Sequence, residues 1–227
     1  DIEKTPELML DSEKTKLKKI KSRLENIAKS VEIEAEWQRS VADGISDAAK
    51  KFNADLIMVS STRHSTLSRL FLSNTDWEIL RHVPLPVLFA HNHEDKPYQK
   101  VIVAVKPAHR DDEPTKLEKQ MLAVGKWICE TFNAELHLAH AYPDHLPETS
   151  IEYMVPSELN TKLKQEHRDA LYRLASKYDI DDENIHFLED YPRTAMPKLA
   201  TDLGSDLVIM GIVSRNFIDR FLIGATA

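Results

Sequence analysis

A glycine-bearing loop near the end of the sequence has residue types that hold phosphate. Gly211 follows an apolar stretch, Ser214 comes three residues later, and Gly224-Ala225-Thr226 follows after nine further residues. Backbone N–H groups of such a loop, together with the N-terminus of a following helix, bind anionic oxygens, and missing side chains allow close approach. The loop therefore predicts an anion site, although a tight turn without a ligand also explains both glycines.

The first half of the chain places other residues at the equivalent positions. These are Ser60, Arg63, Ser73 and Asn74, none of them a glycine. Each side chain narrows the space that a phosphate would fill. We expect this loop to be structural, with a pocket for a different ligand beside Arg63 and His64 as the alternative.

The two halves can be compared because the chain is a tandem repeat. The match is ungapped at a constant spacing of 151 positions, as in Ala49 with Ala200, Asp55 with Asp206 and Arg69 with Arg220. A repeat of this length predicts two units, each with its own core. The expected division is a first domain over residues 1–92, a linker over 93–99 and a second domain over 100–227.

Hydrophobic periodicity predicts alternating strands and helices in both halves. In the first half we expect helices over residues 6–30 and 45–52, strands over 31–37, 55–59 and 87–89, and a helix capped by Thr75 or Asp76. In the second half we expect strands over residues 100–105, 135–141, 185–189 and 206–210, and helices over 114–132, 157–178 and 194–203. The alternation predicts an α/β fold with a parallel sheet and right-handed crossovers.

Three features of these elements add detail. Residues 31–37 alternate apolar and acidic or polar side chains, as in an edge strand, whereas residues 55–59 are continuously apolar, as in a strand buried on both faces. The helix over 114–132 has its apolar stripe at Leu117, Met121, Val124 and Ile128. The first half has no counterpart of residues 100–141, and the second has none of residues 75–89.

Several segments resemble the universal stress protein family in its tandem form. They are the pattern Gly211-x2-Ser214-x9-Gly224-Ala225, residues 135–140 as the second strand of a unit, and residues 79–88 as the passage from its last helix to its last strand. The resemblance implies two doubly wound parallel sheets of strand order 3-2-1-4-5, the first lacking its N-terminal strand–helix–strand and the second its C-terminal helix and strand. It also implies a stress-response protein.

ATP or another adenine nucleotide is the cofactor that the resemblance implies, bound in the second domain. The binding residues would be Ala104, Val105, Lys106, Ala141, Met210, Gly211, Ser214, Gly224, Ala225 and Thr226. Family members that bind ATP carry an aspartate where Lys106 stands, and loss of that carboxylate weakens the nucleoside end of the site, whereas a lysine reaches phosphate. The first domain would be a degenerate partner.

Composition and motifs exclude several other classes. The net charge of −7 argues against nucleic-acid binding, and no apolar run has the length of a membrane span, so we expect a cytoplasmic protein. Cys129 is alone, and His137 and His140 point to opposite faces of a strand, so we predict no metal.

The halves would pack as an intramolecular pseudo-dimer, with a homodimer as a further option.

No nucleophile with a neighbouring base is evident in the sequence, so we expect a protein without catalytic activity. The alternative is an enzyme that uses ATP for hydrolysis or nucleotidyl transfer. Lys106 and Asp111 are its candidate residues.

Overall fold

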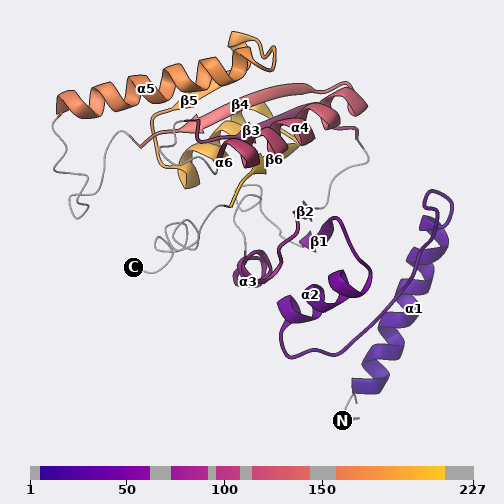
Figure 1. The fold of residues 1–227 in the computed structure, drawn as a ribbon. Helices are drawn as coiled ribbons and strands as arrows, with labels where there is room; N and C mark the ends of the chain where they lie inside the picture. The colour runs from indigo at the N-terminus through magenta and orange to yellow at the C-terminus, as the bar shows by residue number, and fades with distance from the viewer. Residues whose placement is uncertain (1–5, 62–72, 92–95, 108–113, 144–156, 213–227) are drawn as a thin grey trace. The chain divides into compact units, whose positions relative to one another are not determined.

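The computed structural model describes residues 6–61, 73–91, 96–107, 114–143 and 157–212 (Figure 1). These residues form two compact units, one up to residue 91 and one from residue 96. Each unit contains parallel strands with helices between them, which confirms the predicted α/β class.

The first unit contains three helices and two strands among its described residues. They are α1 (Pro6–Leu24), α2 (Val41–Lys51), β1 (Ile57–Ser61), α3 (Asn74–His82) and β2 (Val87–His91). The strands are parallel neighbours, with Ile57 opposite Val87. Ala42 and Ala49 of α2 and Ile79 of α3 pack on Ile57 to form a small core.

The second unit is built on a four-stranded parallel sheet. Its elements are β3 (Lys100–Ala104), α4 (Pro114–Phe132), β4 (Glu135–Ala141), α5 (Ser157–Ser176), the short 3-10 helix η3 (Asp182–Asn184), β5 (Ile185–Leu188), α6 (Pro192–Leu203) and β6 (Leu207–Met210). The strand order is β5-β4-β3-β6, which corresponds to positions 3-2-1-4 of the expected order. The bounds of α4 and β4 are those predicted from the sequence.

Helices cover both faces of this sheet, as the doubly wound arrangement requires. On one face, Leu122 of α4 and Leu171 of α5 pack with Val103 and Leu138. On the other face, residues of α6, including Leu199, pack against the sheet. Because β3 lies between β4 and β6 and is covered on both faces, its three central residues are fully buried.

Polar side chains fix where α3 begins. Ser73 Oγ accepts a hydrogen bond from the Asp76 N–H at 3.1 Å, and Asp76 Oδ2 accepts one from the Ser73 N–H at 2.7 Å. This reciprocal pair is a capping box. The cap of α3 is therefore Ser73, and the prediction of Thr75 or Asp76 was wrong, although Asp76 completes the box.

The strand predicted over residues 31–37 does not form. Val31, Ile33 and Ala35 are half-buried between exposed glutamates, so the alternation is visible in the burial, but the segment has no strand hydrogen bonding. A strand requires a neighbour to receive its ladder bonds. The described sheet of this unit contains only β1 and β2.

Two further expectations about burial were wrong. Leu56 and Met58 are 51% and 65% exposed, so β1 is buried on one face only. In α4, Val124 is 48% exposed, whereas Leu122 and Cys129 are buried. Gly125 belongs to the contact face of α4, because a Cβ there would lie 2.7 Å from Val103 Cγ2.

Candidate functional site

The predicted binding residues that the structure describes lie at one edge of the second sheet. Ala104 at the end of β3 is the register partner of Met210 at the end of β6 and of Ala139 in β4. Val105 and Lys106 follow β3, Ala141 ends β4, and Gly211 follows β6. Because parallel strands end at the same edge, the structure brings these six together. Ser214, Gly224, Ala225 and Thr226 lie outside the described residues.

This edge contains the point at which the chain reverses its direction of winding. From β3 the chain proceeds to β4 and β5 on one side, and then returns to place β6 on the other side of β3. Ligands of open α/β sheets bind outside the carboxyl ends of the strands at such a switch point. The exits of β3 and β6, at Lys106 and Gly211, flank it.

The main chain at the exit of β3 is already hydrogen-bonded within the protein. The Val105 N–H donates to the Ala139 carbonyl at 2.8 Å, and the Lys106 N–H donates to Glu118 Oε1 at 3.0 Å. The Val105 carbonyl is 2.8 Å from His140 Nδ1. The Lys106 side chain is exposed here and accessible to a ligand.

Glu118 of α4 is a member of this site that the sequence did not reveal. Glu118 is 7% exposed. Burial raises the pKa of its carboxyl group, whereas the hydrogen bond from the Lys106 N–H lowers it. It lies beside Leu117 and Met121 in a helical pattern, where a glutamate is expected to face solvent. Only the contact with the end of β3 identifies its role, which is to hold the strand exit in place.

Gly211 lacks a side chain for a reason that concerns packing. A Cβ at this position would lie 2.7 Å from Leu117 Cδ2 and 3.2 Å from Met121 Sδ, both on α4. Among the described glycines, Gly204 has a positive φ and Gly211 does not. The close approach of α4 therefore accounts for this glycine without a ligand.

Aromatic rings gather beyond the end of β4, on the α5 side. His140 and His167 are stacked at 5.0 Å between ring centroids, with His140 Nε2 2.8 Å from His167 Nδ1. Since the Val105 carbonyl can only accept, His140 Nδ1 is the donor to it. Burial lowers the pKa of His167, and the charge of Lys106 lowers it further.

Tyr142 and Phe187 extend this ring cluster. The Tyr142 hydroxyl donates to Asn160 Oδ1 at 2.8 Å, and the Arg168 guanidinium lies 4.5 Å from the Phe187 ring centroid. The sequence pattern shows the strand that carries His140 but gives no signal for His167, which lies on the next helix along the chain.

A second histidine pair lies further back on β4. His137 Nδ1 is 3.1 Å from His186 Nε2, and His137 Nε2 is buried without a hydrogen-bond partner among the described residues, with Glu135 Oε2 at 3.6 Å. Burial lowers the pKa of both rings. Within the described ranges, no three His, Cys, Asp or Glu side chains have an arrangement that could hold a metal ion.

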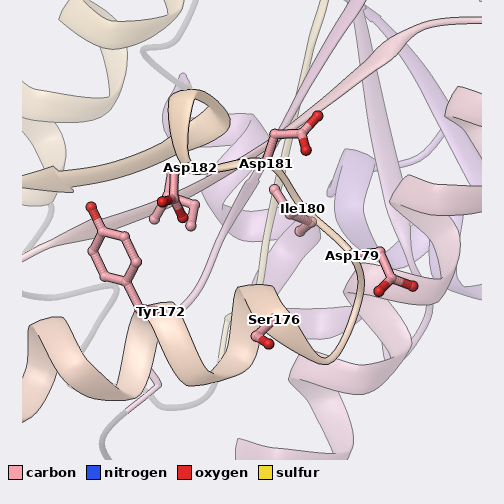
Figure 2. A pocket seen from close by; sticks show the side chains of 7 residues that line it. Tyr172, Ser176, Asp179, Ile180, Asp181 and Asp182 are labelled. Atoms are coloured by element: carbon pink, nitrogen blue, oxygen red, sulfur yellow. The ribbon is translucent and has the colours of Figure 1, made fainter.

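A pocket of about 350 Å³ lies at the opposite edge of the sheet, where α5 ends and β5 begins. Figure 2 shows Tyr172 and Ser176 on α5, facing the segment that carries Asp179, Asp181 and Asp182. Three carboxylates repel phosphate. This pocket is therefore separate from the predicted nucleotide site, in both place and charge.

Two properties of the described chain bear on other classes of function. Cys129 is a free, buried thiol whose pKa is raised by burial, as expected for an apolar packing role. None of the helices that the structure describes combines the length and the apolar character needed to cross a membrane.

Comparison with known proteins places the chain in a family. The model of the universal stress protein family matches residues 1–91 and 97–227. A universal stress protein E homolog of Haemophilus influenzae is 27% identical over 197 residues, and universal stress protein E of Escherichia coli K12 is 27% identical over 208 residues. These alignments cover 84% and 89% of this chain, which spans only 63% and 65% of those relatives.

Solved structures share the fold. A functionally unknown protein from Pseudomonas aeruginosa PAO1 matches with a TM-score of 0.69 and 22% identity, over 89% of this chain and 68% of that one. A universal stress protein from Archaeoglobus fulgidus matches with a TM-score of 0.60 and 16% identity, over 99% of this chain and 74% of that one. With a family match in each half of the repeat, the chain belongs to the universal stress protein family, as a tandem member.

Proposed function

We propose that this protein binds an adenine nucleotide such as ATP in its second unit and does not turn it over. The observation that carries the proposal is the position of Lys106 at the switch point between β3 and β6. A lysine ammonium is a point charge suited to phosphate. The loop that begins at Gly211 would supply further contacts through Ser214, Gly224, Ala225 and Thr226.

The geometry favours the phosphate end of such a ligand over the nucleoside end. Among the described residues, the carboxylate in contact with the exit of β3 is that of Glu118, which is buried and accepts a hydrogen bond from the Lys106 N–H. It is therefore not presented as an acceptor for ribose hydroxyls or as a general base. This arrangement supports a low affinity for the nucleoside alone; Asp111, the other candidate residue for turnover, lies outside the described residues.

Isothermal titration with ATP and with adenosine tests the proposal. We expect ATP to bind the intact chain. Lys106→Ala should weaken the affinity for ATP by about tenfold, because one charge-assisted contact is lost, and should leave the affinity for adenosine unchanged. Lys126→Ala on the exposed face of α4 is the matched control and leaves both titrations unchanged. Absence of ATP binding at millimolar concentration in the unmodified chain would refute the proposal.

We further propose that the halves of the repeat associate as a pseudo-dimer in the cytoplasm, with the first unit as the degenerate partner. The support is the repeat itself, because two copies of one fold present related surfaces. Chemical cross-linking of the intact chain, with mass spectrometry of the linked peptides, tests this. Links between the units in the monomer fraction are expected, and links confined to single units would contradict it.

A further inference from the structure

One peptide group at the exit of β3 is held by titratable side chains on both of its sides. Its carbonyl, that of Val105, accepts a hydrogen bond from His140 Nδ1 at 2.8 Å. Its N–H, that of Lys106, donates to Glu118 Oε1 at 3.0 Å. The backbone that carries the Lys106 side chain is therefore fixed between a carboxyl group and an imidazole.

A second imidazole continues this hydrogen-bonded chain. His140 Nε2 lies 2.8 Å from His167 Nδ1, and the two rings are stacked with an interplanar angle of 15°. The hydrogen-bonded chain thus runs from Glu118 on α4, through the peptide group after β3 and His140 on β4, to His167 on α5. Hydrogen bonds joined in this way polarise one another, so a change of charge at one end alters the bonds along the rest.

The hydrogen bonds also determine where the histidine pair takes up a further proton. His140 Nδ1 carries a hydrogen, because the Val105 carbonyl can only accept, and a second hydrogen lies between His140 Nε2 and His167 Nδ1. The fourth ring nitrogen of the pair is His167 Nε2. A proton added to the neutral pair therefore enters at His167 Nε2, whichever of the two central nitrogens holds the shared hydrogen.

The surroundings of His167 oppose this additional charge in the absence of an anion. Burial lowers the pKa of His167, the charge of Lys106 lowers it further, and Glu166 acts in the opposite direction. Among the described residues, Tyr142 also contacts the ring, with 4.9 Å between the two centroids. The cation that a bound anion would neutralise is therefore one that acts on His167.

Further charges lie on α5 and just after β5. Glu189 is paired with Lys164 at 2.6 Å and with Arg168 at 3.1 Å. These three side chains partly compensate one another. An anion at Lys106 leaves this group unchanged, so the ion pairs of Glu189 do not account for a response of His167 to the ligand.

On the basis of the proposed function, in which a phosphate binds at Lys106, we propose that binding of this anion is coupled to the uptake of a proton by the His140–His167 pair. The negative charge of the phosphate offsets the positive charge of Lys106, so the surroundings of His167 oppose an imidazolium less. An imidazolium in the pair strengthens the hydrogen bond to the Val105 carbonyl, because a charged donor forms a stronger bond. Ligand and proton therefore favour each other, and the affinity for ATP rises as the pH falls.

Nuclear magnetic resonance of the histidine rings in the intact chain tests the coupling. The ring signals are assigned in the unmodified chain, and the pKa of His167 is measured without ligand and with saturating ATP. We expect ATP to raise the pKa of His167 by at least about half a pH unit, because a nearby charge shifts a titration by this order. The internal control is His186, which has His137 as its hydrogen-bond partner at 3.1 Å and should keep its pKa.

Lys106→Gln tests the electrostatic link without any ligand. The variant removes the charge but keeps the main-chain N–H that donates to Glu118. In the ligand-free variant we expect the pKa of His167 to be higher than in the parent, and ATP should not raise it further. Lys126→Gln, on the exposed face of α4, is the matched control and should leave the pKa of His167 unchanged.

Isothermal titration with ATP at pH 7.5 and at pH 5.5 measures the consequence for affinity. The comparison is with His167→Gln, which retains any proton exchange by ATP itself. The ratio of the affinity at pH 5.5 to that at pH 7.5 should be about two- to threefold larger in the parent than in His167→Gln, as a shift of about half a pH unit requires.

Three results would overturn the coupling. In the first, ATP binds but His167 titrates as it does without ATP, so the proposed function stands and the coupling alone fails. In the second, His167 of Lys106→Gln titrates as in the parent, so the two groups are not linked. In the third, the parent does not bind ATP at either pH, which refutes the proposed function and the coupling together.

Discussion

Side chains from three elements determine what is accessible where β3 ends. Glu118 of α4 accepts a hydrogen bond from the Lys106 N–H, and His140 of β4 donates one to the Val105 carbonyl. Nδ1 of His167, on α5, is hydrogen-bonded to Nε2 of His140. Among the described residues at this strand exit, Lys106 offers its charge to solvent.

Histidine burial makes the stability of the second unit depend on pH. His137, His167 and His186 all have a pKa below the ordinary value, with burial as the main cause. As pH falls through about 6.5 the unfolded chain takes up protons that the folded chain does not, so stability is present above that pH and is lost below it. Each histidine contributes a slope of at most about 1.4 kcal/mol per pH unit.

Urea unfolding at pH 7.5 and at pH 5.5, followed by helical circular dichroism, measures this slope. We expect a lower free energy of unfolding at pH 5.5, and a smaller difference between the two conditions in His167→Gln. The variant loses one of the three imidazoles whose pKa is lowered but keeps a hydrogen-bonding side chain. A difference that His167→Gln leaves unchanged would contradict the assignment.

Gly211 gives a second prediction at this scale. Gly211→Ala places a Cβ against the tip of Leu117, a flexible contact, so we expect a loss of about 1 kcal/mol in the free energy of unfolding. In a Leu117→Ala background the same substitution should cost little, because the obstructing atoms are gone. Equal costs in the two backgrounds, measured by urea unfolding, would show that packing on α4 is not the constraint.

At the scale of elements, the distance between α4 and the sheet is set by a glycine. A Cβ on Gly125 would lie 2.7 Å from Val103 Cγ2 and 3.2 Å from Leu136 Cδ1. Val103 is β-branched and fully buried in the central strand, so it has little freedom to move. The helix approaches closely because position 125 has no side chain.

Gly125→Ala therefore combines two effects on stability that oppose each other. Alanine raises helix propensity by about 1 kcal/mol, whereas overpacking a buried interface costs about 1–3 kcal/mol. We expect a net loss of stability, and partial recovery in Gly125→Ala with Val103→Ala. Thermal unfolding of the three variants, with Ala123→Gly on the exposed face as the control for propensity, separates the two effects.

Sequence periodicity predicted elements well where each element depends on its own pattern. The bounds of α4 and β4 agree with prediction because Pro114 opens the helix and apolar residues fill the strand. Residues 31–37 were mispredicted because a strand depends on a neighbour that the pattern does not encode. The site followed the same rule: strand ends such as Lys106 were predictable, whereas Glu118 and His167 arrive from other helices.

For the whole molecule, the repeat has two units of unequal core. The second unit buries residues on both faces of a four-stranded sheet, whereas the described part of the first has a two-stranded sheet with one small cluster. Large apolar side chains such as Trp37 and Met58 are 63% and 65% exposed in the first unit. Burial of apolar area is the main source of stability, so the two units should differ in it.

The chain is therefore expected to unfold in two steps, the first unit before the second. Trp77 of the first unit is 7% exposed, whereas Trp37 and Trp127 are each 63% exposed, so the change in tryptophan fluorescence on unfolding reports mainly on the first unit. Helical circular dichroism reports chiefly on the longer helices of the second unit together with α1. In urea, the fluorescence midpoint should fall below the main circular dichroism midpoint. Leu122→Ala, in the second core, should lower only the later transition by about 2–5 kcal/mol. Transitions that coincide by both probes, and that Leu122→Ala shifts together, would mean that the units fold as one cooperative body despite their separate cores.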